Sequence, residues 1–177
     1  MAAAHALDGC SPPQHRPRVF RNADKADAPN VAVHPPIAWA LALLAGWVLH
    51  RLIPLPFIPP AVPTAWLGAM VFALAVALAV WAFASITRAG SNVPTNLPST
   101  TIVDTGPYRF TRNPIYLGMA LGLIGEAIGL DTVWPLLTLV PFAVVISYGV
   151  IAREEAYLEG KFGDVYRRYR TRVRRWL

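Results

Sequence analysis

Residues 105–118 read TGPYRFTRNPIYLG, and this stretch lies between long apolar segments. Both of its prolines lack an amide hydrogen and have a fixed φ angle, so no continuous helix crosses it. Asn113 followed by Pro114 predicts the start of a helix, with Asn113 as the N-cap and Pro114 as the first helical residue. The free N–H groups of that first turn, beside Arg109 and Arg112, would suit an anionic group. A simpler interpretation is a cytoplasmic loop whose arginines anchor the next span at the headgroups.

The composition is typical of a membrane protein. Of the 177 residues, 55% are hydrophobic and only 15% are charged, which disfavours a soluble domain. A net charge of +6 would suggest nucleic acid as a partner of a soluble chain. Here the basic residues flank apolar segments, so we expect anionic lipid headgroups at the C-terminal arginines and no nucleic acid. The single cysteine, Cys10, excludes an internal disulfide and a cysteine-rich metal site, and no metal is expected.

Four apolar segments predict an all-α, integral membrane helical bundle with about four transmembrane helices. We place these spans at residues 37–53, 64–87, 115–130 and 133–152. The third is short for a span and contains Glu126, which either reaches the outer interface or has a functional role. We expect a disordered cytoplasmic tail over residues 1–34 and one membrane domain over residues 35–177.

The distribution of lysine and arginine predicts the orientation. The short connectors at residues 54–63 and 131–132 contain neither residue, whereas the tail, the central loop and the C-terminal segment contain all but one of the 16. By the positive-inside rule both termini and the central loop face the cytoplasm, and a bacterial inner membrane is the expected location. Arg51 is the exception and can reach the interface by snorkelling.

The chain after the fourth span predicts a cytosolic amphipathic segment. Six arginines occupy the last eleven residues, and apolar residues recur at steps of three and four: Leu158, Phe162, Val165, Tyr169, Val173 and Trp176. Such a segment is suited to lie on the inner leaflet. We expect Gly160 and Gly163 to divide it into two short helices.

Two adjacent acids, Glu154 and Glu155, stand at the membrane edge of this segment. An anchor for anionic lipid gains nothing from them. A cationic partner would explain them, either an arginine of the central loop or a positively charged ligand. Compensation of the dipole of the following helix explains them as well, and the residues alone leave both open.

Two motifs together resemble one known family. GPYRFTRNPIYLG at residues 106–118 and EEAYLEGKFGDVYRRYRTRV at residues 154–173 closely resemble the isoprenylcysteine carboxyl methyltransferase family, whose architecture is shared with phospholipid methyltransferases. The resemblance extends from residue 87 to the C-terminus, with both motifs in the right order and spacing. Residues 1–60 contain none of it.

This resemblance implies an integral-membrane methyltransferase that uses S-adenosyl-L-methionine without a soluble Rossmann domain. The cofactor would lie on the cytosolic side, between residues 88–116 and residues 153–177. By position, its contacts would be Thr100, Thr101, Ile102, Val103, Tyr108, Asn113, Pro114, Ile115, Tyr116 and the acidic residue Glu154. We expect catalytic roles for Arg112, for Glu155 as a proton acceptor, and for Arg153, which lies near a substrate-contacting arginine of the family.

The residues leave the methyl acceptor open. The main expectation is a lipophilic acceptor at the cytosolic membrane face, with carboxyl methylation of an isoprenylcysteine-like substrate. However, the eukaryotic carboxyl methyltransferases have histidine where this chain has Thr100 and Asn113. The alternatives are a phospholipid or small-amine N-methyltransferase on the same scaffold, and a non-catalytic membrane protein that retains the fold.

Overall fold

The computed structural model describes residues 31–92 and 98–177. Most of the predicted tail, residues 1–34, therefore lies outside the described residues, as does Cys10. In the described part the regular elements are all helices, and the one β-type contact is an isolated bridge between Thr111 and Arg174. The predicted all-α class is confirmed.

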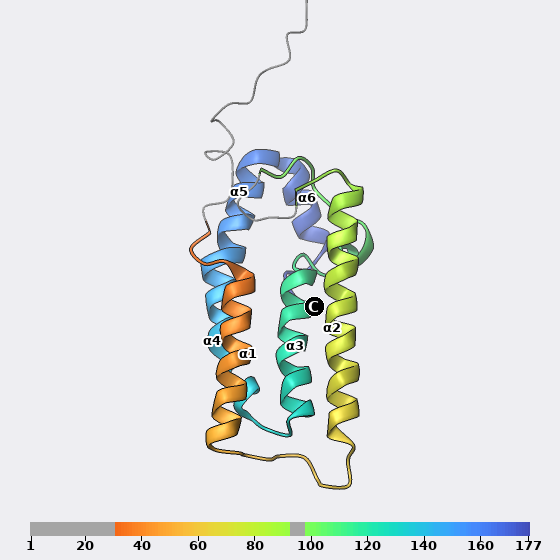
Figure 1. The fold of residues 1–177 in the computed structure, drawn as a ribbon. Helices are drawn as coiled ribbons and strands as arrows, with labels where there is room; N and C mark the ends of the chain where they lie inside the picture. Colours follow the sequence, from red (N-terminus) through yellow and green to blue (C-terminus); the bar gives the residue numbers. More distant parts are fainter. Residues whose placement is uncertain (1–30, 93–97) are drawn as a thin grey trace, which may run out of the picture.

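Long helices run side by side, and short helices cover one end of the bundle (Figure 1). The long helices are α1 (Pro35–Leu52), α2 (Thr64–Arg88), α3 (Pro114–Gly129) and α4 (Trp134–Ile146). A 3-10 turn, η1 (Gly106–Arg109), precedes α3, and a π-helical turn, η2 (Ser147–Ile151), joins α4 to α5 (Ala152–Phe162) and then to α6 (Asp164–Arg172).

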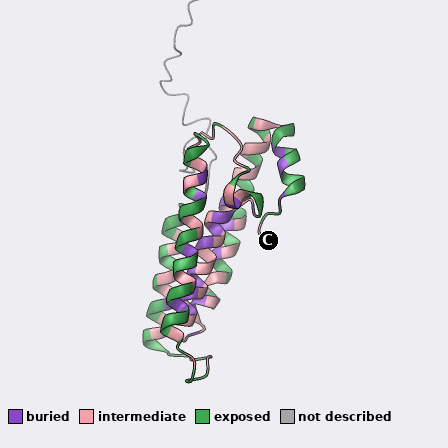
Figure 2. Cartoon of the chain, turned by 90° about the vertical axis from the view of Figure 1, so that its right-hand side faces the viewer, coloured by how far each residue is buried: buried purple, intermediate pink, exposed green. Residues whose placement is uncertain are grey.

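Within residues 31–92 and 98–177, three helices are long and apolar enough to cross a membrane: α1, α2, and the continuous helix from Trp134 to Phe162 that α4, η2 and α5 form. The apolar part of the last one ends at Ala152, and the charged residues that follow lie outside it. The predicted short third span is α3, which is apolar, has 16 residues and contacts all three of the others. Many residues on the outside of the bundle are exposed (Figure 2), and large hydrophobic residues such as Leu41, Leu74 and Val140 are among them. The chain is thus an integral membrane protein.

Close contact between α2 and α3 depends on glycine. A Cβ atom on Gly68 would lie 2.3 Å from Cα of Gly129 and 2.6 Å from the carbonyl oxygen of Gly125. One on Gly118 would lie 2.9 Å from the carbonyl oxygen of Ala75. Small residues allow helix backbones to approach in lipid, where dispersion contacts rather than water exclusion drive association. This packing fixes the start of α3 relative to α2.

The proline-rich connector closes the far end of the bundle. Asp131, in the turn between α3 and α4, accepts hydrogen bonds from the backbone N–H groups of Phe57 (3.0 Å) and Ile58 (2.9 Å). The indole of Trp134 donates to the carbonyl oxygen of Ile53 at 2.6 Å. The connector is therefore fastened to the helical hairpin.

Glu126 lies in α3, toward this far end. Its Oε2 atom is buried and has no hydrogen-bond partner among the described residues. It borders a groove whose other walls are Leu43, Trp47, Gly68, Ala69, Phe72, Gly125, Gly129 and Leu130. Whether its role is interfacial or functional stays untested.

The C-terminal segment forms two helices, as predicted, but only one glycine separates them. Gly163 has a φ angle of +52°, in the region that favours glycine, and it lies between α5 and α6. Gly160 is inside α5, so its predicted role as a break is wrong. A helix tolerates one interior glycine at a cost of about 1 kcal/mol relative to alanine.

The variant Gly68→Ala tests the packing of α2 on α3. The added methyl group would meet backbone atoms that cannot move aside, so we expect a loss of about 1–3 kcal/mol in the free energy of unfolding. The measurement is the thermal unfolding midpoint in detergent. The control is Gly160→Ala, because no atom lies within 4 Å of the added Cβ. An unchanged midpoint for Gly68→Ala would contradict the packing described.

Candidate active site

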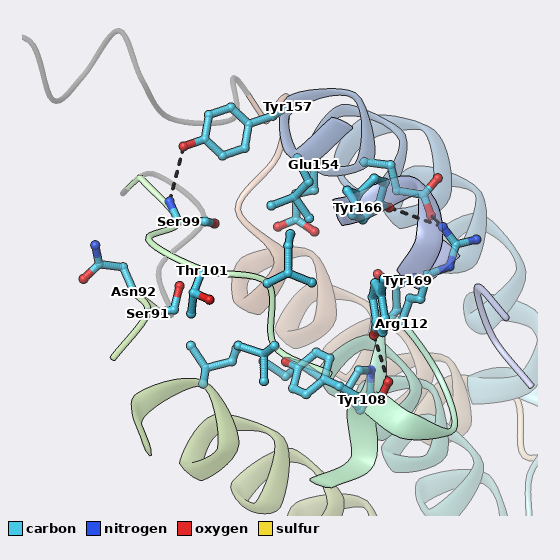
Figure 3. A pocket seen from close by; sticks show the side chains of 18 of the residues that line it. Ser91, Asn92, Ser99, Thr101, Tyr108, Arg112, Glu154, Tyr157, Tyr166 and Tyr169 are labelled. Atoms are coloured by element: carbon cyan, nitrogen blue, oxygen red, sulfur yellow. Dashed lines mark hydrogen bonds and ion pairs between the residues drawn. The ribbon is translucent and has the colours of Figure 1, made fainter. Parts of the chain in front are cut away.

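A cavity of about 160 Å³ lies where the chain segment before α3, the first turn of α3, α5 and α6 meet (Figure 3). The structure brings together all the predicted site residues except Thr100 and Arg153. Those that line the cavity are Thr101, Ile102, Val103, Tyr108, Arg112, Asn113, Pro114, Ile115, Tyr116, Glu154 and Glu155. About forty residues separate Tyr116 from Glu154 in the sequence, and the fold brings the residues on both sides of this gap around one cavity.

The first turn of α3 forms one wall of the cavity. The helix begins at Pro114, as predicted, but the side chain of Asn113 makes no capping hydrogen bond. Its Nδ2 donates instead to the carbonyl oxygen of Arg175 at 2.9 Å, so the predicted capping role of Asn113 is wrong. The backbone N–H groups of an uncapped first turn stay available to a ligand, and the helix dipole favours an anionic one.

Glu154 contributes a buried acid to the cavity. The Tyr116 hydroxyl donates to Oε1 of Glu154 at 2.9 Å, which joins α3 to α5. Burial raises the pKa of Glu154 to about 7; the hydrogen bond from Tyr116 opposes this rise, and the charge of Glu155 adds to it. Since burial disfavours the charged form, this carboxylate is suited to a cationic ligand that would restore the lost stabilisation.

The π-helical turn η2 explains why Glu154, and not Arg153, faces the cavity. Counting from the buried Ile146, a regular α-helix would return to the same face after seven residues, at Arg153. A π-turn takes one more residue to complete, so Glu154 reaches that face instead. Arg153 is exposed and does not line the cavity, which leaves its predicted catalytic role without geometric support.

Arg112 and Glu155 form an ion pair at the cavity wall. Nη1 of Arg112 lies 2.8 Å from Oε1 of Glu155, and the two side chains are 11% and 13% exposed. The same nitrogen donates to the Tyr166 hydroxyl at 3.2 Å. Nε of Arg112 is buried and has no partner among the described residues. Arg109, the other arginine of this stretch, is exposed and does not line the cavity, so only Arg112 can serve a ligand there.

The apolar face of the C-terminal segment packs over the cavity. Tyr166, Tyr169 and Val173 are buried against Ile102, Leu158 and Phe162, and the Tyr169 hydroxyl donates to the carbonyl oxygen of Tyr108 at 2.8 Å. The periodicity therefore indicated a real apolar face. Its assignment to the leaflet was wrong for these residues, because the face contacts protein. Val165 was wrongly included in that face, since it is exposed.

Several lining residues were missed by the sequence analysis. They are Ile86, Ser91, Asn92, Ser99, Tyr157, Leu158, Tyr166 and Tyr169. Leu158 and Tyr169 stood in the periodic pattern, whereas the serines and the asparagine have no sequence signal. The hydroxyl of Tyr157 accepts a hydrogen bond from the backbone N–H of Ser99 at 3.3 Å, which ties α5 to the loop. Thr100 turns outward, because it is exposed and its hydroxyl donates to the carbonyl oxygen of Gly90 at 2.8 Å.

Fold and site together define a helical membrane protein with a partly enclosed cavity, lined by apolar and polar residues, at one end of the bundle. Comparison with known proteins identifies the class more closely, because the model of the family "Phospholipid methyltransferase" matches residues 63–165. The chain belongs to this family. An uncharacterized protein of Haemophilus influenzae is 48% identical over 63 residues, which are 36% of this chain and the whole of that protein.

Family membership implies a membrane methyltransferase domain, and methyltransferases of this family typically use S-adenosyl-L-methionine. The family that matches is related to the isoprenylcysteine carboxyl methyltransferases, but the match does not point to those enzymes specifically. The resemblance noted in the sequence is therefore confirmed at the level of the broader group. The methyl acceptor is not resolved by it.

Replacing Arg112 tests the ion pair at the cavity wall. Arg112→Ala would leave the largely buried Glu155 with one cationic partner fewer, so we expect a loss of roughly 2–3 kcal/mol in the free energy of unfolding. Arg109→Ala is the matched control, and we expect a change within about 0.5 kcal/mol because Arg109 is exposed. Chemical or thermal unfolding in detergent measures both. Equal losses for the two variants would show that the pair does not stabilise the fold.

Proposed function

We propose that this protein transfers a methyl group from S-adenosyl-L-methionine, bound in the cavity, to the amine of a phospholipid headgroup or of another lipophilic amine. The observation that carries the proposal is the partly buried carboxylate of Glu154, which accepts a hydrogen bond from Tyr116 in the same cavity as Arg112. An acid kept from water in this way is suited to a cationic organic ligand. Membership of the phospholipid methyltransferase family supports the same reaction.

The residues of the cavity fit the parts of S-adenosyl-L-methionine. Its sulfonium and amino groups are cationic and match Glu154. Its carboxylate matches the guanidinium of Arg112, which lines the cavity, and the N–H groups at the start of α3. Its adenine matches the aromatic and apolar part of the lining, which includes Tyr108, Ile102 and Leu158. The ligand supplies an electrophilic methyl group, and the protein supplies a site that matches its charges.

Alignment accounts for much of the rate enhancement that we expect. Methyl transfer by in-line displacement requires the nucleophile, the methyl carbon and the sulfur to be collinear, so holding both reactants is worth several orders of magnitude in effective concentration. The hydrogen bond from Tyr116 to Glu154 and the ion pair between Arg112 and Glu155 fix the groups that would orient the donor. Charge is dispersed in this transition state, and no metal is required.

An amine acceptor must lose a proton before or during transfer. We expected Glu155 to accept it, but both oxygens of Glu155 are engaged by arginines, Arg112 on one side and Arg175 on the other. Glu154 is the better candidate, since burial raises its pKa to about 7 and brings it closer to that of the acceptor. We assign Glu155 the role of holding Arg112 in place.

The acceptor is proposed to be an amine rather than a prenylcysteine carboxylate. Asn113 and Thr100 replace the histidines of the eukaryotic carboxyl methyltransferases. The side chain of Asn113 is engaged by the backbone of Arg175, and Thr100 faces away from the cavity. The basic residues near the cavity end support a cytosolic site, in a bacterial inner membrane, by the positive-inside rule.

Transfer of a labelled methyl group from S-adenosyl-L-methionine to a membrane extract tests the proposal. We expect label in the amine-containing phospholipid fraction, and a loss of at least about a hundredfold in Glu154→Ala because the buried acid is removed. Glu159 is also partly buried in α5 but pairs with Arg167 and Arg170 outside the cavity, so it provides the matched control Glu159→Ala. Label in a prenylated, base-labile ester would instead support carboxyl methylation. No transfer and no binding of S-adenosylhomocysteine would end the proposal.

Binding of S-adenosyl-L-methionine should depend on pH through Glu154. Burial raises the pKa of this carboxyl to about 7 in the empty protein. Above that pH the group is ionised and attracts the cation, whereas below it the group is protonated and the attraction is lost. We therefore expect affinity to fall by about tenfold between pH 8 and pH 6. Calorimetric titration at the two pH values measures this. Glu154→Gln should bind weakly at both, because glutamine carries no charge at either pH. The titration of the ligand itself affects both proteins equally, so the difference between them reports the titration of Glu154.

A further inference from the structure

The last residues of the chain lie against the loop that enters α3. Thr111 and Arg174 form a parallel bridge, and the N–H of Arg112 donates to the carbonyl oxygen of Arg174 at 2.9 Å. The carbonyl oxygen of Arg175 accepts from Nδ2 of Asn113 at 2.9 Å and from the hydroxyl of Thr111 at 3.2 Å. These bonds use the backbone of the terminal segment, so they hold it beside the cavity whatever its side chains are.

This placement brings the side chain of Arg175 to Glu155. Nε of Arg175 donates to Oε1 at 3.2 Å, and Nη2 donates to Oε2. Arg112 approaches the same carboxylate with Nη1 at 2.8 Å. Glu155 therefore lies between two guanidinium groups that come from distant parts of the chain. Two-point contact between a guanidinium and a carboxylate is among the stronger and more directional polar interactions in proteins.

The neighbouring arginine behaves differently. Both arginines are exposed, but Nη1 of Arg174 donates a 3.4 Å hydrogen bond to the carbonyl oxygen of Leu177, whereas the side chain of Arg175 reaches Glu155. Arg174 and Arg175 thus share a backbone environment, and one of them reaches the cavity network. The two side chains point to opposite sides, because successive side chains alternate on an extended segment.

We propose that Arg175 is a positioning residue of the active site, which holds Glu155 so that Glu155 in turn orients Arg112 toward the cofactor. This inference rests on the proposed function and extends it to the C-terminal segment. Without Arg175, one Glu155 oxygen loses its partner, and Arg112 is the nearest cation that can satisfy it. Arg112 would then turn further onto Glu155, and the negative charge beside Glu154 would be less compensated. Both changes would weaken the binding of the S-adenosyl-L-methionine carboxylate by Arg112.

The test compares Arg175→Ala with Arg174→Ala in the full-length protein in detergent. We expect Arg175→Ala to weaken the binding of S-adenosylhomocysteine by about tenfold, which corresponds to the loss of one well-formed charged contact. Arg174→Ala should bind within about twofold of the wild type. Because the backbone bonds of the segment remain, and because the Arg175 side chain is 44% exposed whereas that of Arg112 is 11% exposed, the unfolding midpoint of Arg175→Ala should stay within about 3 °C of the wild type. The KM for S-adenosyl-L-methionine should rise while kcat at saturation stays the same.

A double-mutant cycle separates positioning from a general structural effect. If Arg175 acts through Glu155, then adding Arg175→Ala to Glu155→Gln should cost little further affinity. Arg175→Lys keeps the charge but not the two-point geometry, and it should recover part of the affinity. Should Arg175→Ala fold poorly, Arg175→Lys against Arg174→Lys gives the same comparison.

The outcomes distinguish this inference from the function on which it rests. A wild-type protein that does not bind S-adenosylhomocysteine overturns the proposed function. A wild type that binds, with equal affinities in Arg175→Ala and Arg174→Ala, overturns only the role of Arg175. Fully additive losses in the cycle with Glu155→Gln would show that Arg175 does not act through Glu155.

Discussion

The candidate site depends on keeping one carboxylate away from water. Glu154 is partly buried, and a charge removed from water is costly unless a partner offsets it. Within the described residues the hydrogen bond from Tyr116 offsets part of this cost. The pKa of Glu154 is nevertheless raised, so the rest of the cost is not offset in the empty protein. A cationic ligand would supply the rest. The carboxylate of Glu154 is therefore better stabilised when a cationic ligand is bound than in the empty protein. This is the physical basis of the proposal that the ligand is a sulfonium donor.

The bond between Tyr116 and Glu154 requires two helices to be placed accurately. Tyr116 is in the first turn of α3, whose position is set by glycine contacts with α2. Glu154 follows the π-helical turn, which rotates α5 by one residue relative to α4. Buried α-helical hydrogen bonds leave little freedom for either helix to adjust. A one-residue change of register at η2 would exchange an acid for an arginine at the cavity and reverse its charge preference.

Particular residues show how far sequence reasoning reached. The entry of α3 at Pro114, the apolar helices and the meeting of the Tyr116 region with Glu154 followed from local patterns and from a family resemblance. Arg153 was assigned to the site because it lies near a position where the family resemblance places a substrate-contacting arginine, whereas in the structure it is exposed and does not line the cavity. Asn113 was expected to cap its own helix, but a carbonyl group more than sixty residues away competes for its side chain. Arg175 was not considered at all, since nothing local distinguishes it from Arg174.

The sequence by itself determined that the chain is a membrane-embedded helical bundle with a polar loop and an acidic pair at one end. Hydrophobic periodicity, proline positions and charge distribution are local properties, and they act before any distant contact forms. The tertiary structure alone decided that Arg112 and not Arg109 lines the cavity, that Glu154 and not Arg153 faces it, and that the C-terminal segment packs over the site. These outcomes depend on the angle of each helix about its axis and on contacts between segments far apart in the chain, and no local pattern specifies either.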